Sequence, residues 1–260
     1  MPKNLSHPRS PSAIKDFYTA IHTRMAQRAD QSDTRPTIRE FVATLSRFSI
    51  ASAGQALDAG CGGTAAVAIA CANHGFGGVQ AIDINVESLR LAKSLVGPAD
   101  RVIHLSCGSV LSLPFPDRTF DFAACVGVAH HTPDPERVIA ELARVVRPRG
   151  RMYFSVYCFA DSVFECAVQA LRCLGAHVSF GFMHRVSGKS HVMNNFVLDH
   201  MYVPTLWVFR AEEVRTLLAR HGFSMLEEWS SVMDPFAQHG WLGRKISGDG
   251  LMRVWLCERR

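Results

Sequence analysis

The sequence lacks several features that would assign a class of protein at once. Its 260 residues contain no uninterrupted apolar run of about 18 residues, so we expect no membrane-spanning helix. The polar start MPKNLSHPRSPS is not followed by the apolar segment of an export signal. None of the eight cysteines forms a C-x-x-C pair, and most stand among apolar neighbours, which favours reduced thiols. We therefore expect a soluble, cytoplasmic protein.

Charge of one sign is not concentrated anywhere in the chain. The formal net charge is +5, from 28 Lys and Arg against 23 Asp and Glu, yet the basic residues form no run of five or more. An anionic substrate is therefore allowed, whereas nucleic acid is not required. No internal repeat is evident, and 48% hydrophobic residues are enough to bury one large core.

Strand-like and helix-like segments alternate from residue 55 onward. Helical spacing of apolar residues predicts two helices before that point, over 13–29 and 36–48. We then expect strands over 55–59, 78–84, 101–106, 119–126, 150–157, 223–229 and 251–258, and helices over 64–74, 86–96, 134–147, 161–174 and 210–221. Such alternation predicts a parallel sheet covered by helices on both faces. Residues 158 to about 205 break the rhythm and are interpreted as an insertion or cap.

Three glycines stand within four positions in LDAGCGGTAAVAIA, residues 57–70, between a strand pattern and a helix pattern. A glycine-rich turn there lets a ligand approach the main chain, and it points the N–H groups of a helix N-terminus at that ligand. In doubly wound sheets such ligands lie at the carboxyl ends of the strands. Asp83 closes the second strand about twenty residues later, where an acid can accept hydrogen bonds from both hydroxyls of a ribose.

A nicotinamide-dependent dehydrogenase would share these two features. It normally reads G-x-G-x-x-G after the first strand, whereas this chain reads G-x-G-G-T-A, and Asp58 precedes the first glycine. A carboxylate repels a pyrophosphate and attracts an ammonium group. The sign of this charge therefore favours a ligand with a cationic amino acid end.

Several segments between residues 56 and 157 resemble the class I S-adenosylmethionine-dependent methyltransferases, in particular the branch with small-molecule enzymes and the ubiquinone and menaquinone C-methyltransferases. They are LDAGCGG, AIDIN, LSLPFPDRTFD and GVAHHTPDPERVIAELARVVRPRGRM, in the order and spacing of the family. The resemblance implies a Rossmann-like, doubly wound α/β fold with a seven-stranded, mostly parallel sheet, N-terminal helices and a cap insertion before the sixth strand. It divides the chain into N-terminal helices or lid (1–50), cofactor-binding core (51–157), cap or substrate insertion (158–208) and C-terminal part of the core (209–260).

The resemblance also implies S-adenosylmethionine as the cofactor and assigns residues to it. By position these are Asp58, Gly60, Cys61 and Gly62 along the methionine part, Asp83 at the ribose, Ile84, Ser109 and Val110 at the adenine, and Cys125 and Val126 below the sulfonium. Two positions depart from the family, which often has Gly at Thr64 and Asp at Ser109. A hydroxyl bonds the adenine amino group more weakly than a carboxylate does, which predicts a modest cofactor affinity.

The candidate catalytic residues are His131, His130 and Tyr202. The two histidines follow the fourth strand, where a histidine with a pKa near neutral can act as general base, or can simply shape the pocket wall. No third ligand stands at a recognisable spacing from them, so we expect no metal site. Tyr202 lies in DHMYVP, residues 199–204, a stretch without a clear period that we interpret as a substrate-contacting loop.

These observations predict an enzyme of small-molecule biosynthesis that transfers a methyl group to oxygen, nitrogen or carbon, without nucleic-acid or membrane partners. The oligomeric state stays open, with a homodimer as one alternative. A second reading uses the aminocarboxypropyl arm of the same cofactor, by cyclisation or arm transfer, and releases methylthioadenosine. A third is a non-catalytic binding protein of the same fold.

Overall fold

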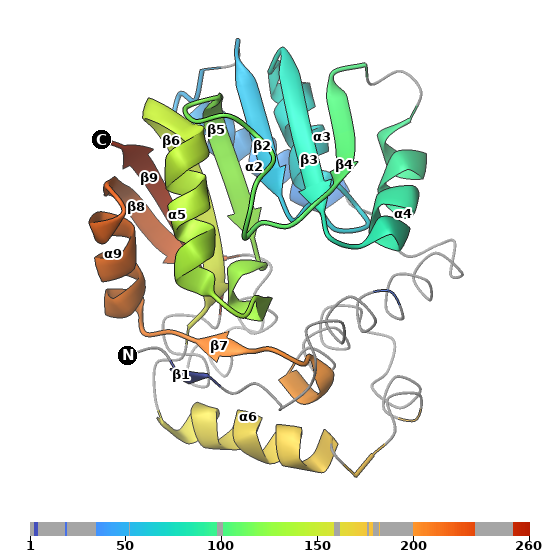
Figure 1. Cartoon of the computed structure of the whole chain (residues 1–260), viewed down its shortest axis with the longest axis vertical. Helices are drawn as coiled ribbons and strands as arrows, with labels where there is room; N and C mark the ends of the chain where they lie inside the picture. The colour runs from blue at the N-terminus through green and yellow to red at the C-terminus, as the bar shows by residue number, and fades with distance from the viewer. Residues whose placement is uncertain are drawn as a thin grey trace.

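A computed structural model of the chain describes residues 3–4, 19, 35–51, 53–97, 101–158, 162–175, 177–178, 182, 200–231 and 252–260. Within them a seven-stranded sheet has the strand order β4-β3-β2-β5-β6-β9-β8 (Figure 1). Its strands are β2 (Gln55–Ala59), β3 (Gly78–Asp83), β4 (Ile103–Cys107), β5 (Phe120–Val126), β6 (Val146–Tyr157), β8 (Phe223–Ser230) and β9 (Met252–Arg259). Strands β2 to β6 pair in parallel, and β9 runs antiparallel to β6 and β8. The predicted doubly wound, mostly parallel α/β sheet is confirmed.

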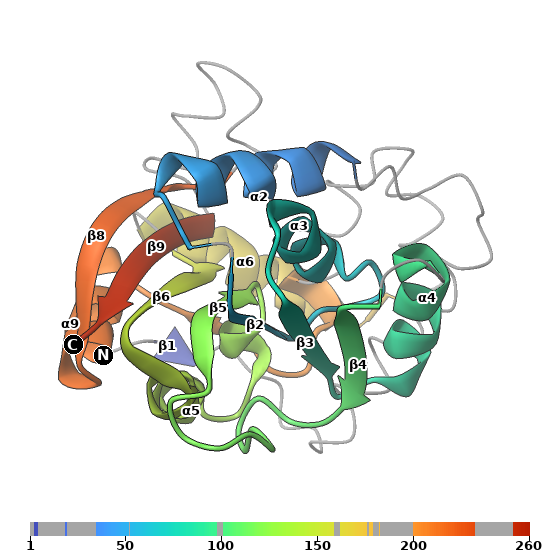
Figure 2. The ribbon, with the colours of Figure 1, turned by 90° about the horizontal axis from the view of Figure 1, so that it is seen from above.

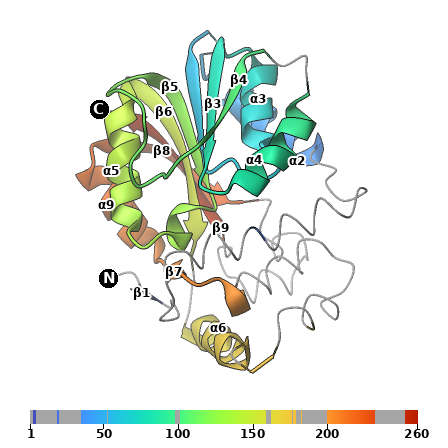
Figure 3. The ribbon, with the colours of Figure 1, turned by 45° about the vertical axis from the view of Figure 1, so that its right-hand side comes forward.

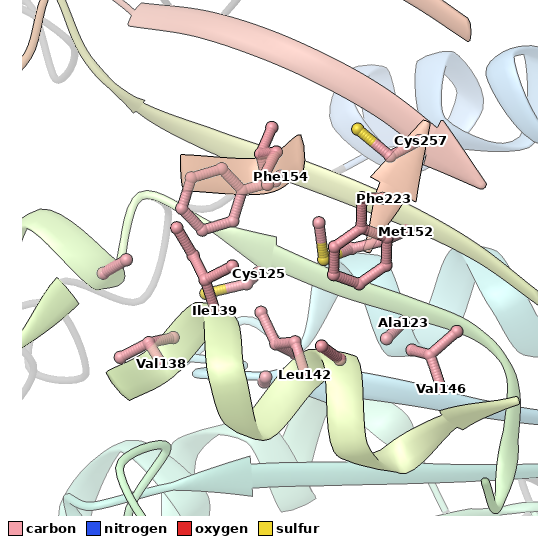
Figure 4. Close-up of a cluster of buried hydrophobic side chains, with 14 of the residues drawn as sticks. Ala123, Cys125, Val138, Ile139, Leu142, Val146, Met152, Phe154, Phe223 and Cys257 are labelled. Atoms are coloured by element: carbon pink, nitrogen blue, oxygen red, sulfur yellow. The ribbon is translucent and has the colours of Figure 1, made fainter. Parts of the chain in front are cut away.

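Helices cover both faces of this sheet (Figure 2). One face carries α2 (Arg35–Arg47), α3 (Ala66–His74) and α4 (Val86–Val96), and the other carries α5 (Pro135–Val145) and α9 (Ala211–Arg220). Each face has its own buried apolar cluster. In the cluster under α5, Ile139 and Leu142 pack toward Met152 and Phe154 of β6 (Figure 4). A sheet buried on both sides in this way explains why its central strands are mostly apolar.

Predicted and observed boundaries differ most between α5 and β6. The helix ends at Val145 rather than at 147, and the strand begins at Val146 rather than at 150. Pro148 accounts for this difference, because a proline disfavours helical backbone at the residue before it. The predicted helix over 13–29 lies outside the described residues, apart from residue 19.

Three short elements and one longer one lie at the carboxyl end of the parallel strands. The strands β1 (Lys3–Asn4) and β7 (Trp207–Val208) pair antiparallel, η1 (Ala129–His131) is a single 3-10 turn, and α6 (Ser162–Gly175) matches the helix predicted over 161–174. Figure 3 shows α6 and the β1–β7 pair beyond this end of the sheet. Strand order reverses between β2 and its two neighbours β3 and β5, which places the switch point of the sheet at this edge.

None of the described helices is long and apolar enough to cross a membrane.

Candidate functional site

The loop between β2 and α3 contains two glycines with positive φ, Gly60 at +90° and Gly62 at +60°. A Cβ built on Gly60 would stand 2.3 Å from Cγ2 of Val128, so the packing of the protein itself requires this glycine. A Cβ on Gly62 would meet no atom within 4 Å. Gly62 therefore faces open space at the sheet edge, where a ligand can reach the main chain. The sequence alone did not separate these two roles.

Asp83 ends β3 and faces the glycine loop. Its Oδ2 accepts the Gly62 N–H at 2.9 Å, and its Oδ1 accepts the Asn85 N–H at 2.8 Å. Burial raises the pKa of Asp83, although the two N–H groups oppose this effect. Each carboxylate oxygen retains a lone pair for another donor. Asp83 thus braces the glycine loop, which sequence reasoning missed, and keeps the capacity to accept hydrogen bonds from ligand hydroxyls.

Asp58 lies inside β2 and is only 2% exposed. Its Oδ2 accepts the N–H of Ala68 in the first turn of α3 at 3.0 Å. The N-cap residue of that helix, Ala65, offers no side-chain acceptor, so Asp58 satisfies a helix N–H from the neighbouring strand. Burial raises the pKa of Asp58 to about 7, with a further contribution from Asp83. This acid is therefore poised to ionise when a cation binds beside it.

The residues predicted for the adenine follow β3 and β4 at the same edge. Asp83 pairs with Cys107 in the parallel register, which brings Ile84 and Ser109 to neighbouring strand ends. The side chain of Ile84 is 50% exposed and offers an apolar surface there, whereas Val110 is buried. The Ser109 Oγ accepts the Leu111 N–H at 3.2 Å, so this hydroxyl shapes its own turn and can still donate its proton.

The two cysteines assigned to the site are buried, unreactive thiols. Burial raises the pKa of Cys125 to about 12 and raises the pKa of Cys61 further above its ordinary value. Both therefore pack as small apolar side chains rather than as nucleophiles. Cys125 and Val126 end β5, directly before the turn that carries the histidines.

His130 occupies η1 and is fully buried. Among the described residues, neither of its ring nitrogens has a hydrogen-bond partner. Its ring centroid lies 4.1 Å from that of His131 and 4.2 Å from that of Tyr157, which ends β6. Burial lowers the pKa of His130 well below its ordinary value, and the neighbouring His131 and His200 lower it further. The ring is neutral and has one donor and one acceptor to offer.

His131 forms a hydrogen bond with the main chain of the segment 200–208. Its Nδ1 lies 3.1 Å from the carbonyl oxygen of Thr205. Because a carbonyl only accepts, Nδ1 carries the proton and Nε2 is the acceptor nitrogen of the neutral ring. Burial lowers the pKa of His131 to about 4. Both rings are therefore uncharged at neutral pH, because burial lowers their pKa values.

Tyr202, the third predicted catalytic residue, donates its hydroxyl proton to the carbonyl oxygen of Val178 at 2.9 Å. That proton is therefore committed to a main-chain carbonyl elsewhere in the predicted insertion 158–208. A different tyrosine contacts the histidines, since the ring of Tyr157 lies between those of His130 and His200, at 4.2 and 4.7 Å between centroids. Sequence reasoning missed Tyr157, although its place at the carboxyl end of the fifth predicted strand was a usable signal.

Within the part of the chain that the structure describes, no group of three or more His, Cys, Asp or Glu side chains is placed to hold a metal ion. The chemistry at this edge is instead that of two buried acids, an open main-chain loop and a cluster of neutral aromatic and imidazole rings. An ammonium group suits Asp58, and vicinal hydroxyls suit Asp83. The residues present therefore fit a nucleoside with a cationic amino acid end.

Known proteins are similar to this chain over the residues that carry the glycine loop and the two acids. Residues 57–154 match a methyltransferase domain family. A ubiquinone biosynthesis O-methyltransferase of Coxiella burnetii is 31% identical over 99 residues, which are 38% of this chain and 42% of that protein. A demethylmenaquinone methyltransferase of Bacillus licheniformis is 32% identical over 110 residues, 42% of this chain and 47% of that protein. This chain thus spans less than half the length of these relatives.

Similar folds extend over more of the chain. The [4+2]-cyclase SpnF superposes with a TM-score of 0.65 and 16% identity, covering 98% of both chains. An S-adenosylmethionine-dependent methyltransferase from Methanosarcina mazei superposes with a TM-score of 0.56 and 21% identity, covering 83% of this chain and 96% of that one. At these identities the likeness shows the shared fold. Residues 57–154 thus match a methyltransferase domain, within a chain that shares its fold with S-adenosylmethionine-dependent methyltransferases.

Proposed function

We propose that this protein is an enzyme that binds S-adenosylmethionine along the carboxyl ends of β2, β3 and β4 and transfers its methyl group to a small molecule. The observation that carries the proposal is the open space at Gly62, flanked by the buried acids Asp58 and Asp83. The quinone and sterol methyltransferases among the relatives support a small-molecule acceptor.

Each residue of this edge has a proposed task toward the cofactor. Asp58 attracts the ammonium group, Asp83 accepts hydrogen bonds from the ribose hydroxyls, and Ile84 packs on the adenine. The cofactor supplies an activated methyl group on a sulfonium, so the protein contributes alignment, exclusion of water and, where needed, a proton acceptor. Cys125 and Val126 form an apolar floor that excludes water from beneath the sulfonium.

The acceptor is proposed to bind on the η1 side of this edge. His130 and Tyr157 supply polar groups there, and the described segment 200–208 covers them. His131 takes a positioning role, because its donor nitrogen is committed to Thr205 and fixes the orientation of the ring. The insertion over 158–208 is proposed as the substrate-binding part of the chain.

The experiment that tests this proposal is product analysis of the purified protein. Incubation with S-adenosylmethionine and a small-molecule extract should yield S-adenosylhomocysteine, detected by mass spectrometry. Asp83→Ala should weaken cofactor binding by roughly 1.5 to 3 kcal/mol for each charge-assisted hydrogen bond lost. Asp117→Ala, at an exposed acid paired with Arg144, is the matched control and should bind as the wild type does.

Two outcomes would overturn the proposal. Methylthioadenosine as the nucleoside product would show that the aminocarboxypropyl arm is the part transferred or cyclised. Calorimetry that detects no affinity for S-adenosylmethionine would leave a protein that retains the fold without this cofactor.

A further inference from the structure

A buried arginine that pairs with none of the described acids lies beside the proposed acceptor site. Arg172, on α6, is 4% exposed, and its Nη1 and Nη2 donate to the carbonyl oxygens of His200 at 3.0 Å and Val203 at 2.8 Å. No carboxylate among the described residues pairs with it. Burial lowers the pKa of Arg172 to about 10, which leaves it charged at neutral pH. Burying a charge without a counter-ion is costly, so its retention calls for an explanation.

The contacts of Arg172 lead directly to the histidine cluster. The residue whose carbonyl it binds, His200, packs its ring on Tyr157, and Tyr157 packs on His130. The positive charge of Arg172 also lowers the pKa of His131, so its field reaches η1. The guanidinium and the unpartnered imidazole of His130 therefore belong to one buried polar region between α6 and the sheet edge.

Several hydrogen bonds hold the segment 200–208 against this polar region. The carbonyl oxygen of Thr205 accepts a hydrogen bond from Nδ1 of His131, and the indole Nε1 of Trp207 donates to the carbonyl oxygen of Thr132 at 3.0 Å. Arg172 holds the other end of the same segment. The charge of Arg172 is thus held against the main chain of His200 and Val203 before any ligand binds, which is how a preorganised recognition site is built.

Arg172 and His130 together indicate the chemistry of a ligand. A buried imidazole with a hydrogen-bond partner at neither nitrogen is uncommon in a native structure, and among the described residues both nitrogens of His130 are available to a ligand. A neutral imidazole provides one donor and one acceptor. A buried guanidinium without an acid favours a negative charge and opposes a positive one.

We propose that Arg172 and His130 mark the binding site for an ionised oxygen on the methyl acceptor, either a carboxylate or the oxygen of an acidic phenol or enol. The inference rests on the proposed function and names its substrate class. A protonated amine would meet an uncompensated positive charge at this site and is disfavoured. Where the acceptor oxygen is itself methylated, it attacks the methyl carbon as the bond from that carbon to sulfur breaks, leaving S-adenosylhomocysteine.

Binding of small probes to the protein saturated with S-adenosylhomocysteine tests the inference. The probes are benzoate for a carboxylate, 4-nitrophenol for a phenolate, and benzylamine for a cation of similar size. Calorimetry should detect binding of at least one anion and no binding of benzylamine, and the visible absorbance of 4-nitrophenol distinguishes bound phenolate from phenol. The stronger of the two anions identifies which oxygen class the site takes.

Substitutions separate a charge effect from a purely structural one. Arg172→Gln should weaken anion binding about tenfold or more, whereas Arg172→Lys, which keeps the charge but not the pair of carbonyl contacts, should retain most of it. His130→Phe keeps the ring and removes its nitrogens, and should weaken the same probe several-fold. Arg90→Gln removes an equal charge from the exposed surface of α4 and should bind the probe as the wild type does.

The inference is overturned if neither anion binds, if benzylamine binds as well as they do, or if Arg172→Gln and Arg172→Lys bind anions equally. Equal behaviour of the two variants, together with a lowered melting temperature, would make Arg172 a structural tie. These results are distinct from failure of the proposed function, which would appear as loss of S-adenosylmethionine binding in the wild-type protein.

Discussion

At the scale of single residues, the site depends on acids that the fold holds in an unfavourable environment. Asp58 is buried with one main-chain donor, and Asp83 stands close enough to raise the pKa of Asp58 further. Among the described residues, neither acid is paired with a basic side chain. Two buried acids without a counter-ion lower the stability of the protein without ligand. The same acids favour binding of a cation, and lost stability of this kind is common at preorganised sites.

Asp58 should therefore lower the stability of the protein as the pH rises. Its pKa is about 7 in the fold and about 3.9 in an unfolded chain, so its contribution to stability is greatest below about pH 4 and is lost as the pH rises through 7. Asp58→Asn keeps an acceptor for the Ala68 N–H and removes the charge. The variant should gain on the order of 4 kcal/mol over the wild type at pH 8, and far less at pH 4. Urea denaturation at both values measures this difference, and equal differences at the two pH values would contradict the assigned pKa.

The same acid predicts proton release when the cofactor binds. At about pH 6.5 most Asp58 is protonated, while the α-amino group of S-adenosylmethionine is already charged. Binding of that ammonium should ionise the acid and release roughly half a proton or more. Calorimetry in buffers of different ionisation enthalpy counts the protons. Asp58→Asn is the control and should release none; release of equal size in this variant would assign the proton to another group.

At the scale of secondary-structure elements, the glycine loop combines one position that the packing requires with one that is open to a ligand. Gly60 is required by contact with Val128, whereas Gly62 has open space beside it. A variant at Gly60 would disturb packing and binding together. A variant at Gly62 probes the ligand space alone, apart from the strain of a side chain at positive φ.

Gly62→Ala should keep a folded sheet and lose cofactor affinity. The methyl group would enter the space where the ligand approaches the main chain, and we expect a loss of about tenfold or more, with roughly 1 kcal/mol of backbone strain. Gly97→Ala is the matched control, because Gly97 also has positive φ and open surroundings but ends α4. Calorimetry on both variants decides the matter. Unchanged affinity in Gly62→Ala, or an equal loss in Gly97→Ala, would place the ligand elsewhere.

The sequence predicted those elements that are long enough for a repeating apolar pattern to be recognised. The alternation from β2 to β6 was predicted to within a few residues, and the resemblance supplied the order of the segments that carry Asp58 and Asp83. The pair β1–β7 has two residues in each strand and no period to detect. Tyr157 and Arg172 come from elements that meet only in the fold, so no local pattern could place them beside His130. The low pKa values of the histidines depend on burial in the same way.

At the scale of the whole molecule, the site has two halves built by different means. The half proposed for the cofactor belongs to the sheet edge, where parallel strands place Asp58, Asp83 and Ser109 side by side. The half proposed for the acceptor belongs to η1, α6 and the segment 200–208, which hydrogen bonds from Arg172, His131 and Trp207 hold together. The two halves share no described hydrogen bond between side chains, so a change in one should leave the other largely intact.

Trp207→Phe tests this independence. The variant keeps an aromatic ring but loses the Nε1–H bond to the Thr132 carbonyl, a loss of about 1 kcal/mol that should open the segment 200–208 from η1 more often. Hydrogen exchange should accelerate in peptides that cover 127–133 and 200–208, while the affinity for S-adenosylmethionine stays that of the wild type. The control is Trp229→Phe in β8, where the indole ring stacks on Phe48. This variant should leave exchange in both peptides unchanged. If Trp207→Phe instead weakened cofactor binding as much as it accelerated exchange, the two halves would form one cooperative unit.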